Sequence, residues 1–228
     1  MRFERKQFSN YSEEEAGKVI ESCEFINCKF TGCYINFSDN PDERTTVKKV
    51  VLRNCEQKKC IIGAAILEDV TVENLKCSGL LQTWGAAFKR VKFKGEIGPL
   101  MISQDIRAAT APPNIQKKFD KQNKEIYRNI EWALDISEAL FEECEIRSIP
   151  AALIVRDPET QIVVDRKTLV KVDLSKINFL GTYFLQALNL FLEREEDDYV
   201  LIAPRLDNDF GSFKTVIDNL VKLGIAKR

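Results

Sequence analysis

The sequence predicts a mainly β fold: a right-handed parallel β-helix of degenerate five-residue repeats with a helical insertion over residues 1–150, followed by a small α/β unit over residues 151–228. Two observations predict it. In the first part of the chain, a small and a large apolar residue recur every five positions, a period that neither an α-helix nor a simple strand has. After Pro150 this period gives way to alternating strand and helix patterns.

The five-residue period occurs in four blocks. The first block reads Cys23-x-Phe25, Cys28-x-Phe30 and Cys33-x-Ile35. The second runs from Val50 to Cys77, where every marked position except Gln57 is apolar. Two shorter blocks cover residues 86–93 and 134–151. The recurrence of one pattern in four separate blocks indicates a repeat architecture.

Such repeats predict a chain that turns at every fifth residue. Four repeats, about 20 residues, would close one square coil, and successive coils would stack about 4.8 Å apart, as neighbouring strands do. The two marked residues of each repeat would point inward. All seven cysteines fall at these positions, so we interpret them as core residues rather than as metal ligands.

The open end of such a stack needs a cover. Ser12 is followed by three glutamates, a capping-box pattern that predicts a helix through about Glu21 over the first coil. Later in the chain, an apolar stripe from Ile115 to Ile130 predicts an inserted surface helix at about 114–131.

The last 78 or so residues are expected to form a β-β-β-α-β-α unit. In chain order the expected elements are a hairpin around 157–160, a strand at 169–175, a helix at 182–196, a strand at 199–204 and a helix at 212–223. The segment 169–189 also fits the five-residue period, so the choice between repeat and α/β structure stays open there.

Two families resemble parts of this chain. The runs CEFINCKFTGCYI and ALFEECEI resemble pentapeptide-repeat proteins, whose repeats read approximately Ala-Asp/Asn-Leu-x-x. This resemblance implies a right-handed β-helix and a mostly non-catalytic role. The run VKVDLSKINFLGTYFLQAL resembles the STAS domains of anti-sigma-factor antagonists. That resemblance implies that Thr182 is a phosphoacceptor, although Gly181 stands where the family usually has Asp.

Composition excludes several kinds of chemistry. The chain contains no histidine, which excludes histidine-based acid–base catalysis, histidine-dependent nucleophiles and histidine-containing zinc sites. The acidic runs at 142–143 and 195–198 are interpreted as solvated turns. We therefore predict no catalytic, metal or cofactor-binding residues. A net charge of −1 makes a nucleic-acid partner unlikely, and the absence of a secretory or membrane-spanning pattern predicts a cytoplasmic protein.

The sequence is thus typical of a protein-binding module, either immunity or antitoxin-like or a scaffold. The expected partner is another protein, whose identity is open, as is the oligomeric state. The candidate partner-binding face lies on the predicted inserted helix and consists of Lys117, Lys118, Lys121, Lys124 and Arg128. Two alternatives remain. One is a STAS-like signalling protein regulated by phosphorylation of Thr182, and the other is an enzyme that acts on carbohydrate through a carboxylate pair.

Overall fold

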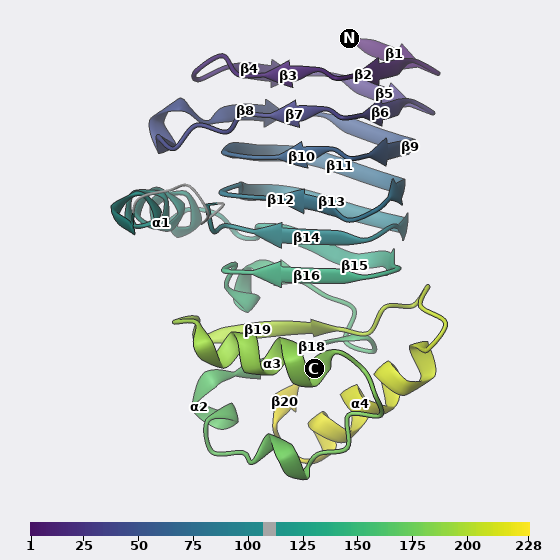
Figure 1. Cartoon of the computed structure of the whole chain (residues 1–228), viewed down its shortest axis with the longest axis vertical. Coiled ribbons are helices and arrows are strands. Elements are labelled where there is room, and N and C mark those ends of the chain that lie inside the picture. The colour runs from purple at the N-terminus through teal and green to yellow at the C-terminus, as the bar shows by residue number, and fades with distance from the viewer. Residues whose placement is uncertain (107–112) are drawn as a thin grey trace.

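The computed structural model describes residues 1–106 and 113–228. Figure 1 shows strands stacked in layers along the long axis, with the N-terminus at one end and a helix-containing unit at the other. The strands of the stack are β1 (Arg2–Glu4), β2 (Gln7–Ser9), β3 (Ser12–Glu13), β4 (Val19–Glu21), β5 (Glu24–Ile26), β6 (Lys29–Thr31), β7 (Tyr34–Ile35), β8 (Thr45–Lys48), β9 (Val51–Lys58), β10 (Ile61–Ile62), β11 (Ala65–Ser78), β12 (Leu81–Thr83), β13 (Ala87–Ile97), β14 (Leu100–Ser103), β15 (Leu134–Phe141), β16 (Cys144–Arg147) and β17 (Ile154–Val155).

These strands form two parallel sheets. The first has eleven strands with the main order β1-β5-β9-β11-β13-β15-β17, and the second has six in the order β16-β14-β12-β10-β7-β3. From β9 onward, successive strands alternate between the two sheets. Most strands therefore pair with one about 20 residues further along the chain, as in the pairing of Val51 with Thr71 and of Ile61 with Gln82.

The predicted β-helix of square coils is wrong. The strands make two separate parallel sheets in an α/β-type architecture: the six-stranded sheet has a linear order, whereas in the eleven-stranded sheet β2, β4, β6 and β8 pair beside the main path. Strands β11 and β13 run for 14 and 11 residues, through positions where the repeat predicted a turn. They bend at residues of positive φ such as Asp69 and Arg90 while they keep their neighbours. The five-residue period therefore marks the inward side chains between bends, not the corners of a closed coil.

One row of bends is stabilised by asparagine. Asn54 and Asn74 both have positive φ, and the Asn74 side-chain amide donates to the Asn54 side-chain oxygen at 2.9 Å. The Asn74 oxygen in turn accepts from the backbone N–H of Glu96 at 3.0 Å. Position 95 beside this oxygen requires glycine, because the Cβ of any other residue would lie 2.0 Å from the oxygen and clash with it.

The core of the stack is filled by the inward side chains of both sheets. Its largest fully buried members are Phe88, Ile97, Leu100, Ile102, Leu134, Ile136 and Phe141. Gln57, the one polar residue at a marked position, is also buried. Its amide donates to the carbonyl of Gly79 at 3.0 Å and accepts from the N–H of Cys60 at 3.3 Å, so burying it leaves no unpaired polar group.

The helix predicted at 12–21 is not present. Ser12 lies in β3, which pairs with β7, and residues 19–21 form β4, which pairs with β8. The Ser12 hydroxyl donates to Glu14 at 2.6 Å instead of capping a helix. Ladder hydrogen bonds to the next layer outweigh the local capping preference, and the first layer is left without a helical cover.

A helix does interrupt the stack between β14 and β15. Helix α1 (Pro113–Arg128) lies against the side of the stack, where the sequence predicts a helix over 114–131. It packs beside β13 and beside the short 3-10 helix η1 (Pro41–Glu43).

The C-terminal unit contains a three-stranded antiparallel sheet of β18 (Gln161–Asp165), β19 (Asp198–Ile202) and β20 (Ala226–Lys227). Its helices are α2 (Arg166–Leu169), α3 (Phe184–Glu193) and α4 (Phe210–Lys222), with 3-10 helices η2 (Ala151–Leu153) and η3 (Leu174–Lys176). Among the described residues, the element order from β17 is β-β-α-α-β-α-β when the 3-10 helices are left out, so the predicted β-β-β-α-β-α order is wrong.

Two local predictions in this unit fail for identifiable reasons. The segments flanking residues 157–160 do not form a hairpin, because β17 pairs with β15 and β18 pairs with β19. Residues 169–175 are not a strand. They end α2 and begin η3, whose first turn is capped when Asp173 accepts the N–H of Ser175 at 3.2 Å.

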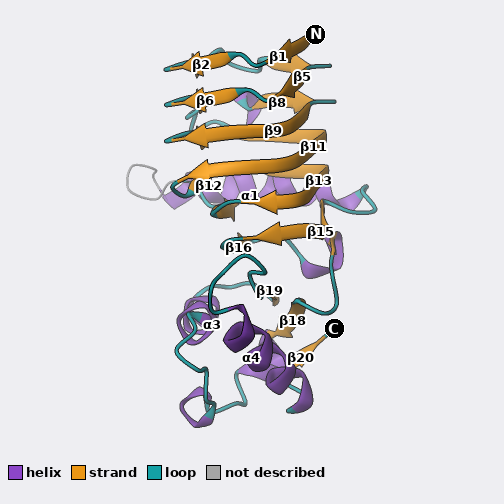
Figure 2. Cartoon of the chain, turned by 90° about the vertical axis from the view of Figure 1, so that its right-hand side faces the viewer, coloured by secondary structure: helices purple, strands orange, loops and turns teal. Residues whose placement is uncertain are grey.

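Strand β19 belongs to both cores. Val200 and Ile202 pack into the core of the stack, whereas Tyr199 and Leu201 pack into the core beneath α3 and α4. This follows from the alternation of side chains along a strand. Figure 2 shows β19 between the last layer of the stack and the C-terminal helices, so the C-terminal end of the stack is covered.

Candidate functional site

Helix α1 is held by side chains three or four residues apart on its inner face. Ile115, Phe119 and Asn123 are all buried. One turn further, the hydroxyl of Tyr127 accepts the backbone N–H of Phe88 in β13 at 3.3 Å. This spacing fixes the rotation of the helix about its axis and so defines which side chains face outward.

A buried cation lies beneath α1. Arg44 is 3% exposed, and its guanidinium donates to the side-chain oxygen of Gln122 at 2.8 Å and to the carbonyl of Gly85 at 3.0 Å. The guanidinium carbon lies 4.4 Å from the centre of the Phe119 ring, within the range of a cation–π contact. Burial lowers the pKa of Arg44 to about 10, so the group stays charged at neutral pH and holds α1 through a permanent charge.

Besides a small apolar cluster that includes Ala64 and Ile106, several polar side chains lie under α1. The side-chain oxygen of Gln116 accepts the N–H of Ile106 at 2.8 Å, and the amide of Gln104 donates to the Tyr127 hydroxyl. Asn123 is 3% exposed, and neither its oxygen nor its nitrogen has a hydrogen-bond partner among the described residues. The hydrogen bonds of Gln104 and Gln116 help to orient this helix. The unpaired amide of Asn123 lowers the stability of the fold.

The outer face of α1 carries the predicted basic residues. Lys117, Lys118, Lys121, Lys124 and Arg128 are all exposed. Four of them line one shallow hollow, together with two acidic residues: Lys117, Asp120, Lys121, Lys124, Glu125 and Arg128. Lys118 follows Lys117 in the helix and is exposed beside this hollow rather than in it. The structure therefore places all five predicted cations on the exposed side of one helix.

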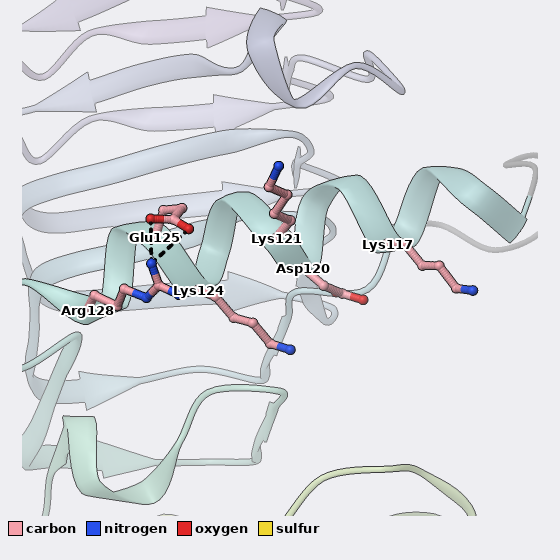
Figure 3. Close-up of a pocket in the computed structure, with 6 residues that line it drawn as sticks. All are labelled: Lys117, Asp120, Lys121, Lys124, Glu125 and Arg128. Carbon is pink, nitrogen blue, oxygen red and sulfur yellow. Dashed lines mark hydrogen bonds and ion pairs between the residues drawn. The ribbon is translucent and has the colours of Figure 1, made fainter.

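The cations of this face differ in their intramolecular partners. Arg128 donates to both carboxylate oxygens of Glu125 at 3.1 Å. Within residues 1–106 and 113–228, no carboxylate forms an ion pair with any of the four lysines. Figure 3 shows the side chains of Lys117, Lys121 and Lys124 extending from the helix, whereas Arg128 turns toward Glu125. The lysine ammonium groups are available to an anionic surface.

The predicted phosphoacceptor lies just before α3. Thr182 is half-buried, two residues ahead of Phe184, the first residue of that helix. Its hydroxyl donates to the carbonyl of Phe179 at 2.8 Å. A phosphate on this oxygen would remove that hydrogen bond and would lie near the N-terminal end of α3.

A polar cluster that no sequence pattern indicates lies between the stack and the C-terminal unit. The Ser148 hydroxyl lies 2.9 Å from a carboxylate oxygen of Glu196 and 3.3 Å from one of Asp105, and Arg194 contacts both carboxylates at 3.5 and 3.9 Å. Burial raises the pKa of Glu196, and the nearby charge of Asp105 adds to the effect. These residues lie 43 and 48 positions from Ser148, so no local sequence signal links them.

This cluster brings two carboxylates near one hydroxyl, which is the kind of grouping that the enzyme hypothesis requires. The Glu196 side chain is only 16% exposed, however, and both carboxylates are engaged by the cation of Arg194. The interpretation of 195–198 as a solvated turn is therefore wrong for Glu196. It is also wrong for Asp198, whose carboxylate accepts the N–H of Ala151 at 2.8 Å. These groups join the two parts of the chain. By contrast, Glu142 and Glu143 are exposed.

The cysteines have the character of core residues. Five are buried, and Cys33 and Cys77 are partly exposed. Burial raises the pKa of the thiols of Cys55, Cys60, Cys77 and Cys144, which disfavours the reactive thiolate form. Across the part of the chain that the structure describes, no three His, Cys, Asp or Glu side chains are grouped so that they could hold a metal ion.

None of the helices formed by the described residues is both long enough and apolar enough to cross a membrane. No known protein-family model matches this chain, and no curated protein matches it either. The resemblances to pentapeptide-repeat proteins and STAS domains therefore remain untested predictions.

Proposed function

We propose that this protein is a non-catalytic protein-binding module whose contact surface is the outer face of α1, and that its partner presents an acidic surface. The observation that carries the proposal is the set of four exposed lysines on one helix with no carboxylate partner among the described residues. Surface cations are usually dispersed among anions in similar numbers, and this helix carries five exposed cations beside only two carboxylates, Asp120 and Glu125. This surplus of positive charge on one face favours a role in attraction.

The way α1 is held supports this role. Phe119 is fully buried, and Arg44 and Tyr127 tie the helix to the loop after η1 and to β13. The lysines therefore project from a fixed backbone. A surface that is already ordered loses less conformational entropy on binding than a mobile segment does.

The charges around the lysines favour a protein over a nucleic acid. Asp120 and Glu125 line the same hollow as Lys117, Lys121 and Lys124. Carboxylates would repel a phosphate backbone, but they can accept hydrogen bonds from donors on a protein partner. The chain as a whole has a net charge of −1, so it has no general surplus of cations for phosphates.

A charge-reversal experiment tests the proposal. The triple variant Lys117→Glu, Lys121→Glu and Lys124→Glu reverses the proposed face. Its matched control reverses three exposed lysines of the stack that line a different hollow, Lys29, Lys58 and Lys76, and so changes the net charge equally. Each tagged protein is used to capture partners from the native cell lysate.

We expect the native protein and the control to retain one protein partner that the α1 variant loses, and we expect added salt to weaken its capture. An immunity-like role and a scaffold role then differ in what the partner does when bound: its activity is neutralised in the first case and kept in the second. Retention of the same partner by the α1 variant, or capture of nucleic acid alone, contradicts the proposal.

A second function, regulation by phosphorylation, has one observation in its favour. Thr182 lies at the N-terminal end of α3, where the helix dipole favours a negative group. Mass spectrometry of the protein isolated from its native cells tests this directly. Phosphate on Thr182, together with changed partner capture by Thr182→Glu but not by Thr182→Val, would support it, and an unmodified Thr182 under all growth conditions would exclude it.

A further inference from the structure

The two ends of the stack differ. At the C-terminal end β19 covers the last layer. At the N-terminal end, within the described residues, β1, β2, β3 and β4 each pair with strands on one side only. Figure 1 shows β1 in the outermost layer, at the end of the main strand order of the eleven-stranded sheet. An open edge presents unpaired N–H and C=O groups to any strand that fits it.

The ladder identifies which groups of β1 are unpaired. The carbonyl of Met1 accepts the N–H of Glu24 at 2.8 Å, and the N–H of Arg5 donates to the carbonyl of Ile26 at 2.9 Å. Because backbone groups alternate in direction along a strand, the N–H and C=O groups of Phe3 also point toward β5. The N–H and C=O groups of Arg2 and Glu4 therefore point away from the stack.

We propose that a second copy of this chain pairs with β1 in antiparallel fashion about a two-fold axis at Phe3, so that the two eleven-stranded sheets become one. In an antiparallel pair, residues directly opposite each other can exchange both of their hydrogen bonds. With Phe3 opposite Phe3, Arg2 lies opposite Glu4 of the second copy. Arg2 and Glu4 are the residues whose backbone groups point outward. The two-fold pairing therefore gives a hydrogen-bond partner to each of these N–H and C=O groups.

The side chains of the edge are complementary in the same register. The Arg2 and Glu4 side chains are 62% and 48% exposed, and the two-fold axis brings each arginine beside a glutamate of the other copy. Opposite charges across an antiparallel pair are stabilising, and like charges are destabilising. The strand is therefore complementary to itself, which favours a second copy over an unrelated chain.

An aromatic ladder ends at this edge. The Phe3 ring stacks on Phe25 with their centres 5.1 Å apart, and Phe8 stacks on Phe30 at 5.2 Å. Phe3 and Phe8 are half-buried and pack against the stack's core. A second copy across β1 would place another Phe3 against the open side of the first and cover apolar surface that the chain itself leaves partly exposed.

The second sheet is protected from the same pairing. Glu13 in β3 is 7% exposed, and its carboxylate accepts the Tyr11 hydroxyl at 2.6 Å and the N–H of Glu15 at 3.1 Å. A charge that points inward on an edge strand is a recognised obstacle to edge-to-edge association. Association is therefore confined to the eleven-stranded sheet.

Sedimentation equilibrium of the full chain over a wide concentration range tests the proposal, with circular dichroism as the check on folding. Glu4→Pro removes an outward N–H but no hydrogen bond to β5. Ser9→Pro is the matched control, because Ser9 lies at the equivalent outward position of β2, where Lys6 and Asn10 make the flanking bonds to β6. We expect a dimer for the native chain and for Ser9→Pro, and a monomer for Glu4→Pro.

Charge variants test the register independently of proline. Arg2→Glu and Glu4→Arg each place like charges opposite one another, and each should raise the dimer dissociation constant about tenfold or more. The double variant, with both changes, restores opposite charges and should return the constant close to its native value. A native chain that stays monomeric, a dimer that Glu4→Pro leaves intact, or a double variant no better than the single variants would each overturn the proposal. So would a native chain that remains monomeric alone but pairs through β1 with another protein.

Discussion

Arg44 and Phe119 form the central contact between the inserted helix and the stack, with the guanidinium carbon 4.4 Å from the ring centre. Arg44 follows η1, and Phe119 lies in the middle of α1. The contact joins segments far apart in the sequence and lies directly beneath the basic face. Whatever α1 binds, the position of its lysines depends on this pair.

A double-mutant cycle measures the strength of the pair. Phe119→Ala should lower the free energy of unfolding by about 3–5 kcal/mol, because a fully buried ring is replaced by a cavity. Arg44→Met removes the charge and keeps the length of the side chain. We expect the two changes to be non-additive by about 1 kcal/mol in denaturant titrations. Strict additivity would show that the two side chains do not interact.

Replacing Asn123 should stabilise the protein. Both polar atoms of this buried amide lack partners among the described residues, and an unpaired buried polar group costs about 1–3 kcal/mol. Asn123→Leu should therefore raise the melting temperature. Gln161→Leu is the matched control, because the Gln161 amide is also buried but has partners. It donates to the carbonyl of Ile136 and accepts from the backbone N–H of Asp157. The control should melt lower than the native protein, and a loss of stability in both variants would contradict this account of Asn123.

Gly63, the residue after β10, lies too close to the backbone of Asn36, the residue after β7, to carry a side chain. A Cβ at this position would lie 1.7 Å from the carbonyl oxygen of Asn36, and backbone cannot move aside as a flexible side chain can. Gly63→Ala should lower the free energy of unfolding by about 3 kcal/mol or more. Gly211→Ala, in α4 with no atom near the added methyl, should raise it by about 0.5 kcal/mol. Equal effects of the two alanines in thermal melts would argue against the close approach.

The pH dependence of stability should report on Glu196. Burial raises its pKa in the folded state, so the folded protein binds this proton more tightly than the unfolded chain does. Stability from this group is greatest below the unfolded pKa and is lost as the pH rises through the folded pKa. Glu196→Gln should therefore gain stability relative to the native protein as the pH rises from acidic to neutral.

Asp69 provides the control of opposite sign. A hydrogen bond from Arg90 lowers its pKa, so its contribution is present above the unfolded pKa and is lost as the pH falls through the folded pKa. Asp69→Asn should lose stability relative to the native protein toward neutral pH. Melting curves across this range that show the same trend for both variants would contradict the assignment.

Much of the core could be predicted from the sequence. The marked residues of the five-residue period include Cys28, Ala65, Phe88 and Phe141, all of which are buried in the stack. The period identifies inward side chains because the two marked residues of each repeat lie two positions apart. In a strand with one buried face, residues two positions apart point to the same side, so both are apolar and the residue between them is polar or variable. It does not contain the pairing order, because the same inward pattern fits a closed coil and two separate sheets.

Local signals failed where long-range pairing decides the structure. Ser12 and the glutamates after it have the pattern of a helix start, yet β3 and β4 gain ladder bonds to β7 and β8. Residues 169–175 have strand composition, but Val170 is 60% exposed and Asp173 caps η3. In both cases the observed structure depends on strand pairing, exposure or capping in the folded chain, which local residue propensities do not describe.

The candidate site was partly accessible from sequence. The lysine spacing on a single helix indicated a basic face, and the structure places all five predicted residues on the exposed side of α1. The support beneath that face was not accessible, because Arg44 lies in a separate loop, 75 or so positions from Phe119. The same holds for Ser148 with Asp105 and Glu196. Such clusters exist only once the fold has formed.

Photo-crosslinking from the outer face of α1 tests directly whether this face contacts the partner. A photoreactive amino acid replaces Lys121 in one protein and Lys76, an exposed residue of β11 that lines a different hollow, in another. Both proteins are irradiated in native cell lysate, and the crosslinked products are identified by mass spectrometry. We expect one protein to be crosslinked from position 121 and not from position 76, with its crosslinked residues beside an acidic surface. A partner that crosslinks equally from both positions, or only from position 76, would contradict the assignment of α1 as the binding face.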